Sequence, residues 1–256
     1  MFRVAEKAGI RRLSSKYYYV EFKLIEPLNA DPLPLQFVNV WIPGVDEVPM
    51  SIAQYKGGEN SISIIFKVVG EGTKALKDVE GFFGIKGPLG KGFDPRHYDK
   101  VLFIGGGVGI APLPYLARYA SQYGVVVDAA WGVRGSDMLF NLKEVANDVN
   151  EIYYATEDCG TGFCGTATQL AIKLVAENKA RWDVVLAVGP GAMLRDLCRL
   201  LSSSVNVYVS PEAMVKCGLG ACGSCVLKPH PKLLCVDGPV FECAEVIDYL
   251  EHVARN

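Results

Sequence analysis

The stretch VLFIGGGVGIAP, residues 101–112, decides the fold that this sequence predicts. A short apolar run ends in glycines, and the residues that follow it read as a helix. Glycines between a strand and a helix let backbone N–H groups approach a pyrophosphate, which the helix N-terminus stabilises. The order of strand, turn and helix favours nucleotide binding over a glycine-rich turn without a ligand. The expected contact residues are Gly105, Gly106, Gly107 and Gly109.

The chain after this stretch alternates between two kinds of segment. Further strands are expected at 125–134, 151–158, 183–191 and 205–211. Helices are expected at 112–124, 138–148, 165–179 and 192–203. Strands that alternate with helices indicate βαβ units and a parallel sheet. Residues 98–211 are therefore predicted to form a nucleotide-binding α/β domain.

The chain before this stretch has a different pattern. Runs rich in Val, Ile, Tyr and Phe lie at 16–26, 35–44, 48–55, 60–70 and 82–90, with turn formers between several of them. A short helix fits residues 72–81. Because several short strands in a row are typical of a barrel or sandwich, residues 1–97 are predicted to form a β-barrel domain. The expected fold class is a β-barrel plus an α/β domain.

Residues 212–256 form a tail that holds closely spaced cysteines. Gaps of four, two and nine residues separate Cys217, Cys222, Cys225 and Cys235. The four-then-two spacing is the plant-type [2Fe–2S] pattern, in which thiolates bind the iron. Zinc is the alternative metal, but its cysteine ligands normally come as two close pairs. The tail is therefore expected to be a [2Fe–2S] module.

Four cysteines lie outside this set. Cys243 follows further along the tail and competes with Cys235 as the fourth ligand. Cys159, Cys164 and Cys198 do not show the cluster spacing, and Cys198 reads as a core residue on a helix. Since the start of the chain does not read as an export signal, eight cysteines suggest reduced thiols and a cytoplasmic location.

Composition excludes several function classes. Half of the 256 residues are hydrophobic and the formal net charge is −2, which indicates a globular protein with room for two domains. No basic stretch resembles a nucleic-acid footprint, and no apolar run is long enough to span a bilayer. Neither a nucleic-acid partner nor a membrane contact is expected.

A barrel followed by such an α/β domain resembles the ferredoxin reductase arrangement, with flavin on the barrel and a nicotinamide nucleotide on the α/β half. Motifs along nearly the whole chain are similar to one family. They are VPMSI (48–52), GEGTKAL (70–76), GPLGKGF (87–93), IGGGVGIAPL (104–113), VGPGAML (188–194), CGLGACGSC (217–225) and CVDGPVF (235–241). On these motifs the chain is identified as a member of the electron transfer subunits of class B dihydroorotate dehydrogenase, the iron–sulfur flavoprotein of pyrimidine synthesis.

The resemblance implies a set of cofactors and contacts. FAD would lie on the barrel and NAD on the α/β domain, and the four tail cysteines would hold the cluster. The residues that would contact FAD are Val48, Pro49, Met50, Ser51, Ile65, Phe66, Lys67, Gly72 and Thr73. The turn at Gly72-Thr73 suits a diphosphate, although Thr73 also reads as a plain helix N-cap.

The resemblance also implies a partner. An FMN-containing catalytic subunit would oxidise dihydroorotate to orotate, in a heterotetramer with two copies of each chain. Electrons would enter the cluster one at a time, and the flavin would pass them in pairs to NAD or another acceptor. No catalytic acid or base is expected in this chain, because the cofactors do the chemistry. The tail is expected to face the partner, with Leu219 and Leu227 at its surface.

Several positions depart from the family pattern. Val48 stands where the family has an arginine, and Met50 where it has a tyrosine that contacts the flavin. Val188-Gly189-Pro190 replaces Cys-Gly-Pro, and Asp158-Cys159 replaces Asp-Gly. The last two changes fall where nicotinamide should meet flavin, so the natural acceptor is left open.

Two other functions stay open. A small subunit of a sulfide dehydrogenase or a ferredoxin:NADP oxidoreductase would share these motifs, with Arg134 and Ser136 placed to contact a 2′-phosphate. A non-enzymatic redox sensor would use the cluster as a switch.

Overall fold

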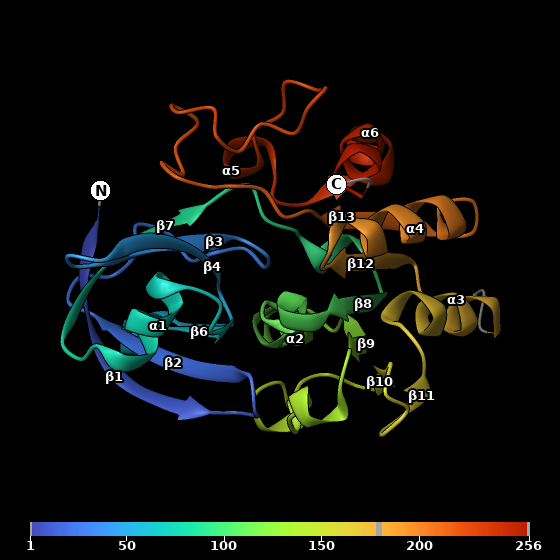
Figure 1. Cartoon of the computed structure of the whole chain (residues 1–256), viewed down its shortest axis with the longest axis horizontal. Coiled ribbons are helices and arrows are strands. Elements are labelled where there is room, and N and C mark those ends of the chain that lie inside the picture. The colour runs from blue at the N-terminus through green and yellow to red at the C-terminus, as the bar shows by residue number, and fades with distance from the viewer. Residues whose placement is uncertain (1, 178–180, 255–256) are drawn as a thin grey trace.

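The computed structural model describes residues 2–177 and 181–254. These residues build two sheets of seven strands each, which stand side by side with the C-terminal tail lying across them (Figure 1). In this part of the chain, none of the helices combines the length and the apolar character needed to cross a membrane.

The first sheet is antiparallel, with the strand order β4-β3-β7-β1-β2-β6-β5. Its elements are β1 (Arg3–Arg12), β2 (Tyr17–Leu24), β3 (Phe37–Ile42), β4 (Asp46–Ser51), β5 (Gln54–Lys56), β6 (Ser61–Lys67), α1 (Glu71–Asp78) and β7 (Phe82–Leu89). Because side chains along a strand point alternately to opposite faces, Val38, Val40 and Ile42 of β3 fill the interior. The intervening residues of β3 lie on the outer face.

Strand β1 was not expected from the sequence. It contains no apolar run, since the buried positions of its first half are Ala5 and Lys7. The Lys7 ammonium donates to the carbonyls of Lys77 and Val79 at the end of α1 and pairs with Glu80. A buried cation that caps a helix C-terminus therefore takes the place of an apolar side chain, and hydropathy does not reveal it.

The second sheet has the order β11-β10-β9-β8-β12-β13-β14 and is parallel except for β14. Its strands are β8 (Lys100–Gly106), β9 (Val126–Val133), β10 (Ile152–Thr156), β11 (Phe163–Cys164), β12 (Val184–Val188), β13 (Asn206–Ser210) and β14 (Phe241–Glu242). The helices between them are α2 (Leu113–Ser121), α3 (Ala167–Glu177) and α4 (Gly191–Leu201). The expected β-barrel plus α/β fold is confirmed. Positions 178 and 179 of the expected helix 165–179 lie outside the described residues.

The helix expected at 138–148 is wrong. The structure has two 3-10 turns in this region, η4 (Ser136–Met138) and η5 (Leu142–Glu144). Two backbone carbonyls accept from side chains here: Val145 O from Gln54 Nε2 at 3.2 Å, and Val149 O from Lys143 Nζ. The apolar spacing of the segment resembles a helix, but tertiary bonds hold its backbone in turns.

The tail ties the two domains together. It packs against Phe37 and Leu89 on the outer face of the barrel and includes the short helix α5 (Leu234–Asp237). It then adds β14 to the second sheet and ends in α6 (Cys243–Val253), which packs on α4. A disulfide joins Cys198 of α4 to Cys243.

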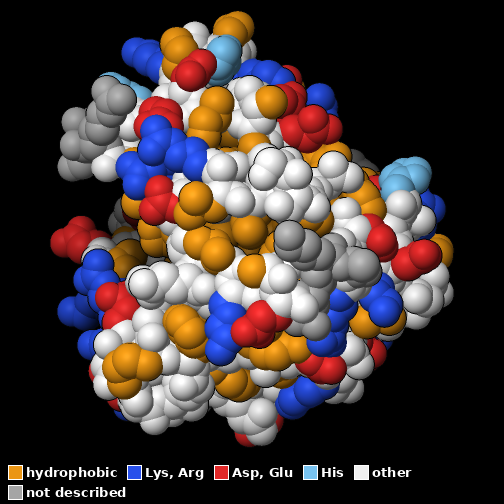
Figure 2. Space-filling model, turned by 90° about the vertical axis from the view of Figure 1, so that its right-hand side faces the viewer, with side chains coloured by type: hydrophobic (Ala, Val, Ile, Leu, Met, Phe, Trp, Pro, Cys, Tyr) orange, Lys and Arg blue, Asp and Glu red, His pale blue; other side chains and the backbone are white. Residues whose placement is uncertain are grey.

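The surface charge is mixed. Figure 2 shows the side of the molecule that lies at the right in Figure 1, and on its described part Lys, Arg, Asp and Glu side chains are interspersed. This agrees with the formal net charge of −2.

Candidate functional site

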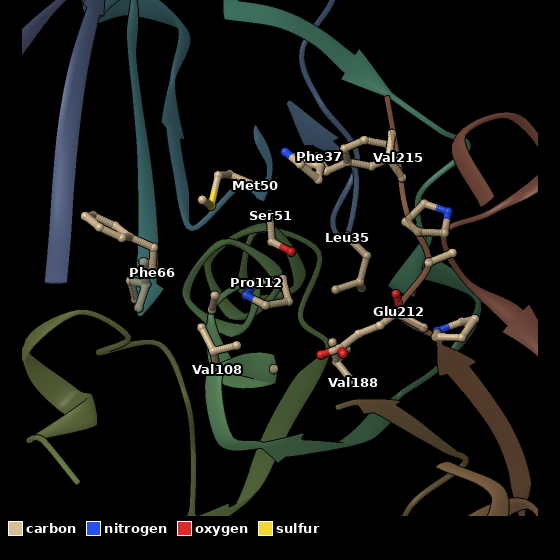
Figure 3. A pocket seen from close by; sticks show the side chains of 18 of the residues that line it. Leu35, Phe37, Met50, Ser51, Phe66, Val108, Pro112, Val188, Glu212 and Val215 are labelled. Atoms are coloured by element: carbon tan, nitrogen blue, oxygen red, sulfur yellow. The ribbon is translucent and has the colours of Figure 1, made fainter. Parts of the chain in front are cut away.

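A cavity of about 300 Å³ lies where the barrel, the α/β domain and the tail meet (Figure 3). Several residues predicted to bind cofactors line it: Pro49, Met50, Ser51, Ile65, Phe66, Lys67, Thr73 and Gly109. Val188, the last residue of β12, also lines it. The strand order of the second sheet reverses between β8 and β12, so the cavity adjoins the switch point where such sheets bind ligands.

The barrel wall of the cavity is mainly apolar. Met50 and Phe66 lie on one side in Figure 3, and Ser51 lies between them and the opposite wall. Ser51 pairs directly with Phe37 on β3, so the two side chains share one face of the sheet. An apolar wall with a few polar groups suits a flat aromatic ring.

Val48 and Gly72 contact each other and do not line the cavity. A Cβ atom on Gly72 would lie 2.8 Å from Val48 Cγ1 and 2.8 Å from a carboxylate oxygen of Asp46. Glycine therefore permits the close packing of α1 on β4. Val48 supports the start of α1 from the barrel side.

The Thr73 hydroxyl is used within its own turn. It accepts from the backbone N–H groups of Val69 at 2.9 Å and Gly70 at 3.1 Å, and it donates to Gly70 O at 3.0 Å. Thr73 is not the N-cap residue that the alternative expected, because Gly70 holds that position; Thr73 is the third residue of α1 and caps the N-terminus from there. A diphosphate at this turn would meet the backbone N–H groups at the start of α1.

The glycine-rich loop after β8 brings two chain segments together. A Cβ atom on Gly109 would lie 2.1 Å from Val188 O, and one on Gly106 would lie 2.6 Å from the Met193 sulfur. Gly107 has a φ of +57°, which favours glycine. Of the four predicted glycines, Gly109 lines the cavity; Gly105, Gly106 and Gly107 shape the loop behind it.

Sequence reasoning missed Glu212. Its carboxyl group lies on the wall opposite Met50 and Phe66, close to Val188 (Figure 3). Glu212 comes two residues after the end of β13. Its position after the carboxyl end of a parallel strand is the signal that would have revealed it.

The loop after β10 holds an ordered carboxylate. Asp158 accepts from the Ser136 backbone N–H at 2.8 Å, the Ser136 hydroxyl at 3.0 Å and the Gly160 N–H at 3.0 Å. The Ser136 N–H, followed by the Gly160 N–H, lowers the pKa of Asp158 to about 2. The next residue, Cys159, forms a disulfide with Cys164. Both donors of Ser136 are therefore directed at Asp158.

The four spaced cysteines of the tail are free thiols in the structure. Cys225 and Cys235 are buried with their sulfur atoms 3.3 Å apart. Cys217 is half-buried and Cys222 is exposed, and their side chains interact. The tail cysteines thus form two neighbouring pairs. In the described part of the chain, no three His, Cys, Asp or Glu side chains converge on a single metal position.

Cys243 does not compete with Cys235 in the structure, because it is bonded to Cys198. The expectation that all eight thiols are reduced is also not met, since two disulfides are present. The Cα atoms of Cys198 and Cys243 lie 5.5 Å apart, which is an ordinary separation for a bridge. Cys198 lies in α4 and Cys243 lies in α6, and the packing of these two helices brings the two cysteines together.

Three glycines shape the backbone of the tail loop. Gly218, Gly220 and Gly223 all have φ values near +70°, at +70°, +78° and +68°. This left-handed backbone is open to glycine at little cost. The Leu219 N–H points at the Cys217 sulfur at 3.4 Å. Backbone N–H groups aimed at sulfur are typical of iron–sulfur sites.

The thiols differ in acidity. Hydrogen bonding by Ser224, with a smaller effect of Cys217, lowers the pKa of Cys222 to about 6. Burial, followed by the neighbouring Cys225, raises the pKa of Cys235 to about 11. A metal that binds Cys235 must therefore displace the proton of this thiol.

Comparison with known proteins gives the class of the molecule. The structure superposes on an NADH-dependent reduced ferredoxin-NADP oxidoreductase with a TM-score of 0.83 and 25% identity, covering 98% of this chain and 93% of that one. It also matches the ferredoxin reductase in carbazole 1,9a-dioxygenase, with a TM-score of 0.71 and 21% identity over 82% of this chain and 68% of that one. The fold and the interdomain cavity define a protein of the ferredoxin reductase class.

Sequence comparison gives the family. Residues 212–247 match the iron–sulfur cluster binding domain of dihydroorotate dehydrogenase B. The dihydroorotate dehydrogenase B (NAD(+)) electron transfer subunit of Fusobacterium nucleatum is 35% identical over 83% of this chain and 86% of that protein. The probable subunit of the same name from Pyrococcus horikoshii is 34% identical over 93% of this chain and 92% of that protein. The chain belongs to the family of dihydroorotate dehydrogenase B electron transfer subunits.

Proposed function

We propose that this chain carries electrons from a dihydroorotate-oxidising subunit to NAD, through a [2Fe–2S] cluster in its tail and an FAD in the interdomain cavity. One observation carries the proposal: the tail loop and the cavity share a wall. Leu234 lines the cavity, and its neighbour Cys235 is one of the four tail thiols. Val215, two residues before Cys217, lines it as well. Such proximity is what transfer between a cluster and a flavin requires.

The four tail thiols are the proposed cluster ligands. Cys217 and Cys222 form one pair, and Cys225 and Cys235 form the other. Two pairs fit a cluster with two iron atoms, each held by two thiolates, better than a single zinc ion, which needs its ligands around one point. The glycines of the loop leave room, and the Leu219 N–H would stabilise negative charge on sulfur.

The cavity residues are the proposed flavin contacts. Met50, Ile65 and Phe66 would pack on an aromatic ring, and Ser51 would supply a polar contact. The first N–H groups of α1 would face the diphosphate of FAD, which FMN lacks. When bound, the flavin supplies the ability to accept single electrons and release pairs.

The nucleotide would lie along the carboxyl ends of β8, β9 and β10. Asp158, held by Ser136, is a carboxylate on this edge. A carboxylate suits the free 2′-hydroxyl of NAD and repels the 2′-phosphate of NADP. Because the Ser136 donors are already taken by Asp158, the proposed acceptor is NAD.

The tail is the proposed contact with the catalytic subunit. Leu219 is exposed, as expected, together with Met214 and Val236. Leu227, however, is fully buried against the barrel and α/β core. An aspartate at Leu227 would therefore disturb folding and would not report on docking. The two-plus-two stoichiometry and the cytoplasmic location expected from the sequence stay predictions.

Co-purification tests the proposal. The chain is expressed together with its catalytic subunit, and the complex is assayed for flavin, iron, sulfide and dihydroorotate-dependent NAD reduction. We expect one FAD and two irons on this chain, and NAD reduction that depends on its presence. A chain that carries no iron, or a catalytic subunit that reduces NAD equally well without it, contradicts the proposal.

A second function is favoured by the structural likeness to the NADH-dependent reduced ferredoxin-NADP oxidoreductase, which covers nearly the whole chain. In that case electrons would arrive from ferredoxin and the acceptor would be NADP. The same preparation separates the two functions, since ferredoxin-dependent NADP reduction without dihydroorotate activity would favour the second.

A further inference from the structure

The outer face of the barrel exposes large hydrophobic side chains on adjacent strands. Phe82 is 58% exposed and Trp41 is 45% exposed, and Phe2, Val4 and Ile25 are exposed with them. These five residues are called the barrel patch here. Single exposed hydrophobics are ordinary on protein surfaces, whereas a contiguous group of this size is often functional.

The strand register makes the barrel patch contiguous. Val4 of β1 lies opposite Gly84 of β7, and Gly84 lies opposite Trp41 of β3. Since Gly84 has no side chain, the Phe2 and Trp41 rings close over it, with centroids 6.2 Å apart. Phe82 is two residues before Gly84 and so shares its face. The Ile25 N–H donates to Val4 O, which places Ile25 beside Val4.

The other half of the same face is already covered by the tail. Phe37 and Leu89 are buried in the cluster that contains Cys225 and Cys235. Between the two halves lies Asn39, a fully buried residue whose Nδ2 donates to Lys216 O at 2.8 Å. Lys216 directly precedes the first proposed cluster ligand.

A polar network marks the border between the halves. Asn39 Nδ2 also donates to Glu47 at 2.6 Å, and Glu47 pairs with the Lys86 ammonium. That ammonium lies 4.7 Å from the centroid of the Phe2 ring in the barrel patch. A molecule seated on the barrel patch would therefore meet the tail loop immediately across this border.

We propose that the barrel patch is a docking surface for the catalytic partner subunit, continuous with the exposed side of the tail loop. This inference rests on the proposed function. Continuity with the tail loop, the proposed contact with the catalytic subunit, selects this occupant over a second copy of the chain. Aromatic side chains present about 150–250 Å² each, so the partly exposed barrel patch offers roughly 400 Å². A stable interface needs about 800 Å² per partner, which the barrel patch does not reach alone. The barrel patch is therefore one part of a larger interface that continues over the exposed side of the tail loop, where Leu219 and Val236 lie.

Single substitutions at the barrel patch test the proposal in the co-expressed complex. Trp41→Ser and Phe82→Asp change exposed side chains, so the barrel should keep its fold. Leu200→Asp, a change at an exposed leucine of α4, is the matched control. Affinity for the catalytic subunit is measured by biolayer interferometry, flavin and iron by absorbance, and the mass of the isolated chain by light scattering.

We expect both patch variants to bind the catalytic subunit at least about tenfold more weakly, with unchanged flavin and iron, and Leu200→Asp to bind like the wild type. Wild-type binding by both patch variants overturns the inference while leaving the proposed function intact. So does an isolated dimer that the variants convert to monomers without loss of partner binding. A wild-type chain that does not bind the catalytic subunit at all overturns both.

Discussion

Two loops of this protein share the sequence pattern C-G-x-G-x-C, but their cysteines differ in bonding. Residues 159–164 read CGTGFC, and residues 217–222 read CGLGAC. The first pair of cysteines forms a disulfide, whereas the second pair remains free. Spacing within the loop therefore does not decide between a disulfide and a cluster site. The surroundings of each loop must decide.

The disulfide loop is closed by its own strands. Phe163 and Cys164 form β11, which pairs with Ala155 and Thr156 of β10 and so brings Cys164 back beside Cys159. The Thr156 hydroxyl adds bonds to Thr161 within the loop. Among the described residues, no further cysteine lies at this edge of the sheet. Cys159 and Cys164 therefore have no other thiol with which to pair.

The tail loop is supported by a second pair. A short hairpin with a bridge between Val226 and Leu233 returns the chain, and the Leu234 N–H bonds to Cys225 O. This hairpin places Cys235 beside Cys225 in the buried core. The same motif that forms a disulfide at residues 159–164 therefore becomes part of a group of four thiols in the tail, because the buried pair lies beside Cys217 and Cys222.

The largest expected effect follows from that second pair. Cys225→Ser removes a buried proposed ligand and should abolish the visible iron–sulfur absorbance and the bound iron, while flavin stays bound. The double variant Cys159→Ser/Cys164→Ser is the matched control and should keep the full cluster. Iron retained in Cys225→Ser would show that Cys225 is not a ligand. Iron lost in the double variant would show that the loop at residues 159–164 is needed for the cluster.

The buried disulfide gives the next largest effect. Cys198→Ser/Cys243→Ser removes the link between α4 and α6, and a link that closes a loop of this length typically contributes about 2–4 kcal/mol. Urea unfolding under non-reducing conditions should show that loss, with iron content unchanged. If Cys243→Ser loses the cluster and Cys235→Ser keeps it, Cys243 is the fourth ligand.

A third test compares matching glycines of the two loops. Gly220 and Gly162 both have left-handed backbones, with φ values of +78° and +71°. A Cβ atom would meet the Val236 side chain at 2.8 Å in the first case and the Tyr154 backbone oxygen at 2.3 Å in the second. Gly220→Ala should cost about 1–2 kcal/mol of loop strain and speed iron release to a chelator roughly tenfold.

Gly162→Ala should leave iron release unchanged. It should loosen the disulfide loop more strongly than Gly220→Ala loosens the tail loop, because the backbone oxygen of Tyr154 cannot rotate aside as a side chain can. Faster hydrogen exchange of the backbone amides of β10 and β11 would show this loosening. Gly223→Ala is the control for strain alone, since its Cβ would meet no atom within 4 Å. Equal iron release in Gly220→Ala and wild type would show that the loop conformation does not matter to the cluster.

The same comparison explains what the sequence reveals and what it does not. The longer strands of the two sheets other than β1 follow from runs of apolar residues, and the proposed cluster cysteines stand out by their combined spacing. Leu219 and Leu227 look alike in sequence, yet one is exposed and the other is buried, because a hairpin folds Leu227 into the core. The shared C-G-x-G-x-C pattern conceals two different outcomes, since strand pairing and burial are set by residues far along the chain.

The smallest expected effect concerns nucleotide binding at the disulfide loop. The three hydrogen bonds to Asp158 do not involve either sulfur atom. Cys159→Ser/Cys164→Ser should therefore change the dissociation constant for NADH by less than about twofold, a difference below about 0.4 kcal/mol. Fluorescence titration of the flavin-loaded chain measures it.

The pH dependence of that binding sharpens the test. Backbone N–H groups lower the pKa of Asp158 from its ordinary 3.8 to about 2. The stabilising contact is thus fully present above the ordinary pKa and is lost only as the pH falls through about 2. Between about pH 5 and pH 8, NADH binding should not vary through this carboxylate in the wild type or the double serine variant.

Asp158→Asn keeps an oxygen acceptor without the charge and should narrow the preference for NADH over NADPH. If the double serine variant loses its preference for NADH as Asp158→Asn does, the disulfide holds the Asp158 carboxylate in place. Cys159 and Cys164 would then contribute to nucleotide binding.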